Sequence, residues 1–174
     1  MKKLMFALAA LALSATAVQA QEAQAQARRP FGLGIAIVPL EPWNVEIYAP
    51  LAVAPNIRVE PSLGVSTRDE SAGGQDTRDV TIGVGLFYVA PVATAFDLYM
   101  GGRLKLNFAK VDNGVNDESG TDVSLAAAIG GEHYLATHFS LGAEAQLGFY
   151  SESDVSGDAS GLYTTGLAFL RFYF

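Results

Sequence analysis

Hydrophobic residues recur at every second position along most of this chain, in segments of about ten residues. A period of two is typical of β-strands, in which successive side chains point to opposite faces of a sheet. Clusters of turn-forming residues separate the segments. The pattern predicts eight strands, over residues 31–38, 44–53, 56–67, 79–89, 96–111, 122–135, 138–151 and 161–174.

The connections between these segments alternate in length and charge. Residues 54–55, 90–95 and 136–137 are short and uncharged, whereas residues 68–79, 112–121 and 152–160 are long and acidic. When antiparallel strands follow one another up and down, every second connection lies at the same end of the sheet. The alternation therefore predicts an up-and-down antiparallel order with the acidic loops at one end.

Each predicted strand has one face rich in large hydrophobic residues, which Lys110 and His133 would join only at the strand ends, and a second face that carries charges among glycine, alanine and serine. The interior of an eight-stranded barrel is only just wide enough for side chains, so dozens of Leu, Val, Ile and Phe side chains cannot point inward. They must face lipid, where backbone groups are satisfied only if the strands form a closed ring. The sequence predicts an all-β fold, an eight-stranded antiparallel up-and-down transmembrane β-barrel.

The last predicted strand must pair with the first to close this barrel. Aromatic residues near the strand ends predict two interfacial girdles. One contains Phe31, Tyr88, Phe96, Phe139, Phe172 and Phe174, and the other contains Trp43, Phe108 and Phe149. Pro50 and Pro61 remove backbone donors inside predicted strands, which leaves the strand registers open there.

The N-terminal residues do not share the strand pattern. Lys2 and Lys3 precede an apolar run, and small residues at Val18 and Ala20 complete the features of a secretory signal peptide cleaved after Ala20. The apolar run is too short for a membrane-spanning helix. We predict a signal peptide over residues 1–20, a periplasmic tether over 21–30 and the barrel domain over 31–174.

Composition excludes several kinds of chemistry. Cysteine is absent, so disulfides, thiol catalysis and thiolate metal sites are excluded. Loss of Lys2 and Lys3 leaves 9 basic against 18 acidic residues, a net charge of −9 that argues against nucleic acid as a partner. The acidic segment 112–122 has Gly114 where a calcium-binding loop needs its second ligand. We expect no catalytic residues, no cofactor and no metal site.

Charged residues on the inward face are nearly balanced in sign. Charges in a confined interior need partners, because their desolvation otherwise outweighs the gain. We predict that they form a paired network that plugs the lumen and reaches over the small residues of the first and fourth strands. A gated or conducting role is the alternative. The network residues are Glu46, Arg58, Glu60, Arg103, Lys105, Glu132, Glu144 and Arg171, with Asp97 near a turn.

The signal peptide, the eight alternating strands, the long outer loops and the terminal phenylalanine resemble the small eight-stranded outer membrane barrels, typified by the barrel domain of outer membrane protein A and by outer membrane protein X. The resemblance implies a monomer in the bacterial outer membrane that contacts outer membrane lipids. It also implies biogenesis through periplasmic chaperones and the barrel-assembly machinery. Leu170, Phe172 and Phe174 match the family's C-terminal assembly signal, although Phe169 stands where that signal usually has glycine. We expect no peptidoglycan-binding domain after Phe174.

The resemblance implies a non-enzymatic protein with a structural, envelope-integrity or adhesin-like surface role through its acidic extracellular loops. A narrow pore or transporter for small or hydrophobic solutes is the alternative. A lipid A-modifying enzyme is a third hypothesis, because His138 and Ser140 resemble a deacylase His-x-Ser motif. We expect no enzymatic activity, because His133 and His138 flank a turn on the predicted periplasmic rim and Glu152 belongs to the opposite rim.

Overall fold

The computed structural model describes residues 30–37, 45–68, 76–112 and 117–174. The predicted signal peptide, most of the predicted tether and Trp43 lie outside these ranges. Within them, no helix is long and apolar enough to cross a membrane. The strands are β1 (Gly32–Ile37), β2 (Val45–Tyr48), β3 (Leu51–Ala54), β4 (Ile57–Arg68), β5 (Asp76–Ala93), β6 (Phe96–Asp112), β7 (Asp117–Ala136), β8 (Phe139–Ser151) and β9 (Ser160–Tyr173).

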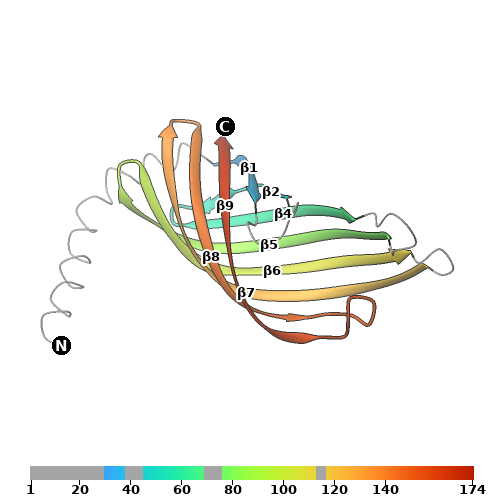
Figure 1. Cartoon of the computed structure of the whole chain (residues 1–174). Helices are drawn as coiled ribbons and strands as arrows, with labels where there is room; N and C mark the ends of the chain where they lie inside the picture. The colour runs from blue at the N-terminus through green and yellow to red at the C-terminus, as the bar shows by residue number, and fades with distance from the viewer. Residues whose placement is uncertain (1–29, 38–44, 69–75, 113–116) are drawn as a thin grey trace, which may run out of the picture.

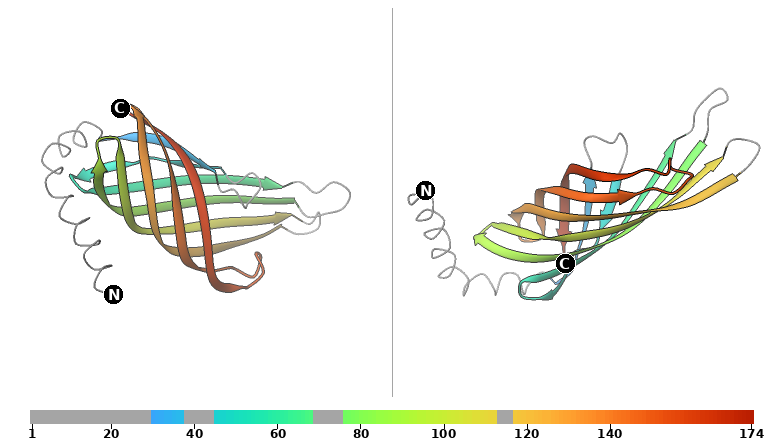
Figure 2. Two further views of the ribbon diagram at one scale, coloured as in Figure 1. Left: turned by 60° about the vertical axis from the view of Figure 1, so that its left-hand side comes forward. Right: turned by 90° about the horizontal axis from the view of Figure 1, so that it is seen from below.

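These strands form one closed antiparallel ring (Figures 1 and 2). β1 pairs with β2, β2 and β3 both pair with β4, each later strand pairs with the next, and β1 pairs with β9 to close the cylinder. At this seam the N–H of Phe174 donates to the carbonyl oxygen of Phe31 at 3.0 Å. The two aromatic rings stack with centroids 5.6 Å apart. The predicted eight-stranded antiparallel barrel is confirmed, with β2 and β3 together forming one of its eight strands.

Two prolines explain why that strand is recorded as two pieces. Ala49 N–H donates to the carbonyl of Pro61, but Pro61 has no N–H to return the second bond. On the other side, Gly32 N–H donates to the carbonyl of Pro50, and Pro50 likewise returns none. Over these two residues the strand makes fewer backbone hydrogen bonds to its neighbours, but its register does not change.

The structure shows the strand register around Pro50 and Pro61, which the sequence analysis left open. Before the interruption Ile35 pairs with Ile47, and after it Phe31 pairs with Leu51, so both strands advance by the same four residues. A one-residue slip would have moved every following side chain to the other face. The strand therefore keeps its inward and outward faces across Pro50.

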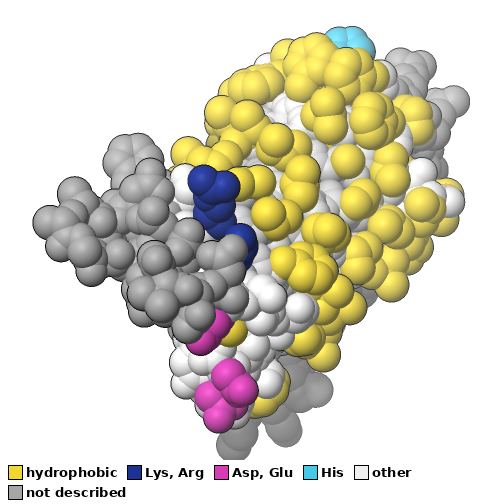
Figure 3. All heavy atoms as spheres, turned by 90° about the vertical axis from the view of Figure 1, so that its right-hand side faces the viewer, with side chains coloured by type: hydrophobic (Ala, Val, Ile, Leu, Met, Phe, Trp, Pro, Cys, Tyr) yellow, Lys and Arg dark blue, Asp and Glu magenta, His cyan; other side chains and the backbone are white. Residues whose placement is uncertain are grey.

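Side chains alternate between the lumen and the outer surface as the sequence predicts. Large apolar residues remain exposed on the outside, with 42% of Leu104 and 58% of Leu147 accessible. Hydrophobic side chains cover most of the face seen in Figure 3. The girdle residues that the structure describes also lie on this outward face: Phe31, Tyr88, Phe96, Phe139, Phe172 and Phe174 toward one end, and Phe108 and Phe149 toward the other. This surface matches a hydrocarbon environment.

Five strands are longer than predicted at the end that carries the long loops: β5 by three residues, β7 by five, and β4, β6 and β9 by one each. Four residues of the predicted loop 68–79 belong to β5 and one belongs to β4, and most residues of the predicted loop 112–121 belong to β6 and β7. β7 has 20 residues, whereas about 9–11 tilted residues cross a bilayer. At the other end, β5 continues to Ala93, so the predicted turn 90–95 shrinks as well. Cross-strand hydrogen bonds continue beyond the residues whose alternating hydrophobicity predicts a strand.

The connection between β8 and β9 is held against the top of β7. Asp122 Oδ1 accepts hydrogen bonds from the backbone N–H and the hydroxyl of Ser153, both at 2.8 Å. Asp122 Oδ2 accepts from the hydroxyl of Ser156 at 2.8 Å. This loop is therefore docked onto the barrel rather than extended away from it.

Placing a charge on the outer wall tests the orientation of the barrel. Leu104→Arg puts a cation on the lipid-facing side near the middle of the hydrophobic stretch of β6 and is expected to lower the free energy of unfolding in lipid vesicles by about 2–4 kcal/mol. Thr121→Arg, on the same outward face at the loop end, is the control and is expected to cost at most about 1 kcal/mol. Equal losses for the two variants, measured by urea unfolding, would contradict the assigned orientation.

Candidate functional site

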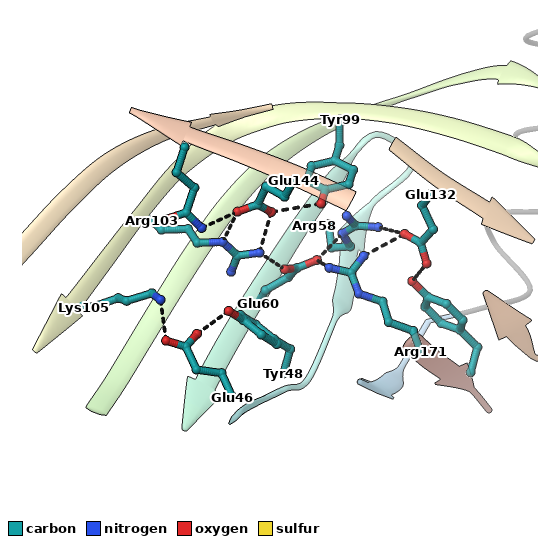
Figure 4. A network of polar contacts seen from close by, with 12 residues as sticks. Glu46, Tyr48, Arg58, Glu60, Tyr99, Arg103, Lys105, Glu132, Glu144 and Arg171 are labelled. Atoms are coloured by element: carbon teal, nitrogen blue, oxygen red, sulfur yellow. Dashed lines mark hydrogen bonds and ion pairs between the residues drawn. The ribbon is translucent and has the colours of Figure 1, made fainter. Parts of the chain in front are cut away.

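The lumen is the candidate functional site, because it contains the eight charged residues that the sequence predicts to form a network (Figure 4). Six strands supply them: β2, β4, β6, β7, β8 and β9. All eight named charges point inward, and only Lys105 keeps appreciable exposure, with 17% of its side chain accessible. Four acidic and four basic side chains therefore share a confined interior.

Glu60 lies at the centre of this network and is fully buried. Its Oε1 is 2.7 Å from Arg58 Nε and 2.7 Å from Arg171 Nη2. Its Oε2 is 2.7 Å from Arg103 Nη2. One carboxylate thus contacts three guanidinium groups that come from three different strands.

Glu132 forms a second centre and is also fully buried. Its Oε2 is 2.7 Å from Nη1 of both Arg58 and Arg171. Its Oε1 accepts hydrogen bonds from the hydroxyls of Ser140 at 2.5 Å and Tyr173 at 2.6 Å. Glu60 and Glu132 share two arginines, so their ion pairs form one connected unit.

Glu144 extends the network toward the loop end. Arg103 donates from Nε to Oε1 at 2.7 Å and from Nη2 to Oε2 at 2.8 Å, which is the bidentate geometry of a strong charge-assisted pair. Tyr99 and Gln146 donate to the same carboxylate at 2.9 Å and 2.7 Å. This carboxylate therefore has four donors.

Glu46 lies at the edge of the network. Its carboxylate contacts Lys105 Nζ and accepts a hydrogen bond from the hydroxyl of Tyr48. Near the opposite rim, Asp97 accepts a hydrogen bond from the Tyr134 hydroxyl at 2.9 Å. The charged core is thus flanked by tyrosine–carboxylate pairs on both sides.

Aromatic rings fill the space around the charges, and the sequence analysis missed most of them. The guanidinium carbon of Arg171 lies 3.9 Å from the Phe169 ring centroid. That of Arg103 lies 4.7 Å from the Phe87 centroid. Such stacking favours arginine over lysine at these positions. The signal was available, because the buried rings share the inward parity of the charges: Tyr48, Phe87, Tyr99, Phe169 and Tyr173.

Glycines on the inward face provide the room for these large groups. A Cβ at Gly130 would lie 2.3 Å from the Tyr99 ring, and one at Gly34 would lie 2.7 Å from Arg171 Cγ. Small residues and large side chains thus alternate across neighbouring strands. This complementarity lets large side chains of the barrel wall pack together inside the lumen.

The residues of the hypothetical deacylase motif are not brought together. Ser140 is fully buried and donates to Glu132, whereas His138 Nδ1 lies 2.8 Å from the carbonyl oxygen of Tyr173. Glu152 follows β8 at its far end, twelve residues beyond Ser140. Among the described residues, no group of three or more His, Asp or Glu could hold a metal ion.

The arrangement has a clear physical consequence. Each buried carboxylate in the core faces at least one cation, and the four acidic and four basic groups balance in charge. Desolvated charges are tolerated only with such pairing. These eight side chains thereby form a charge-balanced set of ion pairs inside the lumen.

Comparison with known proteins agrees with this architecture. Residues 7–168 match the family model described as outer membrane protein beta-barrel domain. Among solved structures, neisserial surface protein A is similar with a TM-score of 0.59 and 19% identity, over 83% of this chain and 93% of that chain. None of the curated proteins matches this chain.

Two further solved structures share the barrel. The attachment invasion locus protein of Yersinia pestis, in complex with the heparin analogue sucrose octasulfate, gives a TM-score of 0.52 at 14% identity, over 82% of this chain and 92% of that one. The N-terminal β-barrel domain of Pseudomonas aeruginosa OprF gives 0.51 at 12% identity, over 83% and 95%. At these identities the likeness concerns the fold alone.

Proposed function

We propose a function for this chain from the premise that it belongs to the outer membrane protein β-barrel family and lies in the bacterial outer membrane. The protein acts as a closed, non-enzymatic barrel. Its role is structural, in envelope integrity, or lies in surface interaction through the loops that follow its long strands.

The observation that carries this proposal is the filled lumen. Glu60 and Glu132 are fully buried and bind arginines from three strands, so side chains occupy the lumen at this level. A pore for small solutes needs an interior with open polar surface. The packing therefore supports a closed barrel over the alternative of a narrow pore or transporter.

The loop end supports a surface role. β5, β6 and β7 have 18, 17 and 20 residues and continue beyond the stretch that hydrocarbon requires. Their extensions carry carboxylates in an acidic protein that has a net charge of −7 before processing. We place this end outside the cell, with the short turns in the periplasm. The extended strands would then present the acidic segments to partners beyond the lipid headgroups.

The absence of enzymatic activity is part of the proposal. Ser140, the nucleophile of the hypothetical motif, is fully buried, and its hydroxyl donates a hydrogen bond to Glu132 rather than to a histidine. A nucleophilic serine needs an adjacent base and access to its substrate. These contacts support a structural role for Ser140.

The proposed partners follow from the same architecture. The outer wall contacts outer membrane lipids, and the protein acts as a monomer without nucleic acid. Leu170, Phe172 and Phe174 lie on the outward face of the closing strand, 52%, 49% and 57% exposed. We propose that this exposed row serves as the assembly signal for periplasmic chaperones and the barrel-assembly machinery.

A genetic experiment tests the proposed role. A strain that lacks the protein is expected to become more sensitive to detergent or to lose surface binding, and the wild-type gene should restore either property. A variant in which a short Gly-Ser segment replaces residues 69–75, and Asn, Asn and Gln replace Asp112, Asp117 and Glu118, separates the two roles, because it should restore only detergent resistance. An increased uptake of small hydrophilic dyes on expression of the wild type would instead support the pore.

A further inference from the structure

Two cations interrupt the uncharged outer face of the barrel at a single place. Six lysine and arginine residues have side chains that the structure describes, and four of them point into the lumen. The other two, Arg78 on β5 and Lys110 on β6, point outward and are exposed. They are direct register partners across the β5–β6 ladder.

Their position along the strands places them at the edge of the hydrophobic surface. The next outward pair toward the barrel centre is Val80 and Phe108, which are 40% and 43% exposed. Figure 3 shows basic side chains against the border of the hydrophobic surface. Asp76 and Asp112 are register partners two residues further toward the loops. The outer face thus changes from apolar to basic toward the loops.

The length of the strand puts the cations at headgroup height. Tyr88, in the girdle at the other end, lies ten residues from Arg78 on the same face of β5. At about 3.3 Å per residue and a tilt of about 40°, ten residues rise about 25 Å along the barrel axis. That height equals the apolar band of an outer membrane barrel, about 25 Å. Arg78 and Lys110 therefore lie at the interface on the loop side.

The chemistry of this pair fits a phosphate group. Cross-strand partners have Cβ atoms about 4.5–5.5 Å apart, so one anion can contact both side chains. Arginine binds phosphate through two parallel N–H donors, and lysine adds a mobile point charge. Their aliphatic stems can lie along the apolar wall while the charged ends reach the headgroups.

We propose that Arg78 and Lys110 bind a phosphate group of a phosphorylated outer-leaflet lipid of the lipid A type, whose acyl chains lie along the adjoining apolar wall. The assignment to this leaflet rests on the proposed orientation, with the loop end at the cell surface. The pair would anchor the barrel at a fixed height and recruit a shell of phosphorylated lipid around β5 and β6.

Lipid binding to the folded full chain in maltoside micelles tests this site. Native mass spectrometry would follow a titration with diphosphorylated lipid A. Replacing both cations, in Arg78→Gln with Lys110→Gln, is expected to weaken binding about thirtyfold, since each cation near an anionic surface contributes about one factor of five. The charge-conserving double variant, Arg78→Lys with Lys110→Arg, should stay within about threefold of the wild type.

Two further arms use only the wild-type protein, so they do not depend on how the variants fold. Lipid A treated with phosphatase should bind as weakly as diphosphorylated lipid binds the glutamine variant. Inorganic phosphate at 10 mM should not displace the lipid, and displacement would assign the site to free phosphate and overturn the lipid proposal. Equal binding of the phosphorylated and dephosphorylated lipid would overturn it as well. Both cations lie outside the lumen, so such a failure leaves the closed-barrel proposal to be judged separately by conductance.

Discussion

Glu60→Gln is expected to lower the free energy of unfolding in lipid vesicles by about 3–5 kcal/mol, the cost of breaking a buried ion pair by removing one partner. Glu60 contacts Arg58, Arg103 and Arg171, each at 2.7 Å, so its neutralisation leaves three buried guanidinium groups with one carboxylate fewer. Glutamine keeps the shape but presents N–H donors to cations that also donate. Urea unfolding, followed by the shift between folded and unfolded gel bands, measures the loss.

Glu46→Gln is the matched control for this prediction. The cation that faces Glu46 is Lys105, whose side chain is 17% exposed and can turn to solvent when the carboxylate is lost. We expect a loss of about 1–2 kcal/mol. If Glu60→Gln destabilised the barrel no more than Glu46→Gln, the central position of Glu60 in the network would be refuted.

Gly101→Ala is expected to cost about 3 kcal/mol or to prevent the folded form from accumulating, which is the upper range for overpacking. An ideal Cβ at Gly101 lies 2.0 Å from the carbonyl oxygen of Leu86 and 2.8 Å from Phe87 Cα. Both atoms belong to the backbone of β5, so rotation of a side chain cannot relieve the contact. The close approach of β5 and β6 at this point would have to open, next to the ring of Phe87 that packs against Arg103.

Gly102→Ala provides the control on the adjacent residue. A Cβ at Gly102 meets only the carbonyl oxygen of Ala126, at 3.4 Å, and points to the outer face. We expect a change of less than about 1 kcal/mol. Comparable unfolding midpoints for the two alanine variants would show that the inward glycine is not needed for lumen packing.

The comparison between sequence and structure shows what a strict period of two can establish. The parity of a strand determines which residues share a face, so the outward positions of Leu104 and Leu147 could be predicted without coordinates. The alternation of short and long connections gave the up-and-down order. The closing pair of β1 and β9 follows from the requirement that a barrel in lipid has no free edge.

The partners within the lumen could not be predicted in the same way. Arg58 and Glu132 are far apart in sequence, yet their atoms approach to 2.7 Å. Which cation meets which carboxylate depends on the stagger between strands and on how far each side chain reaches across the lumen, and parity carries neither quantity. The sequence therefore gave the set of inward charges but not their pairing.

The limits of the strands were missed for a different reason. Hydrophobic alternation ends where the strand leaves the hydrocarbon region. The cross-strand hydrogen bonds, however, continue beyond that point. Asp112 and Asp117 are register partners in β6 and β7, although both were assigned to a loop. Phe87 and Tyr99 also lie on the inward face, but the charged residues alone were used to predict the contents of the lumen.

The closed lumen is the claim on which the proposed function depends, and single-channel recording on the folded protein in planar lipid bilayers tests it most directly. Because the ion pairs of Glu60, Glu132 and Glu144 occupy the lumen, we expect the wild-type protein to produce no stable steps in the current across the bilayer. Reproducible channels of fixed conductance, present in every preparation of the folded form, would contradict the account and favour the narrow pore.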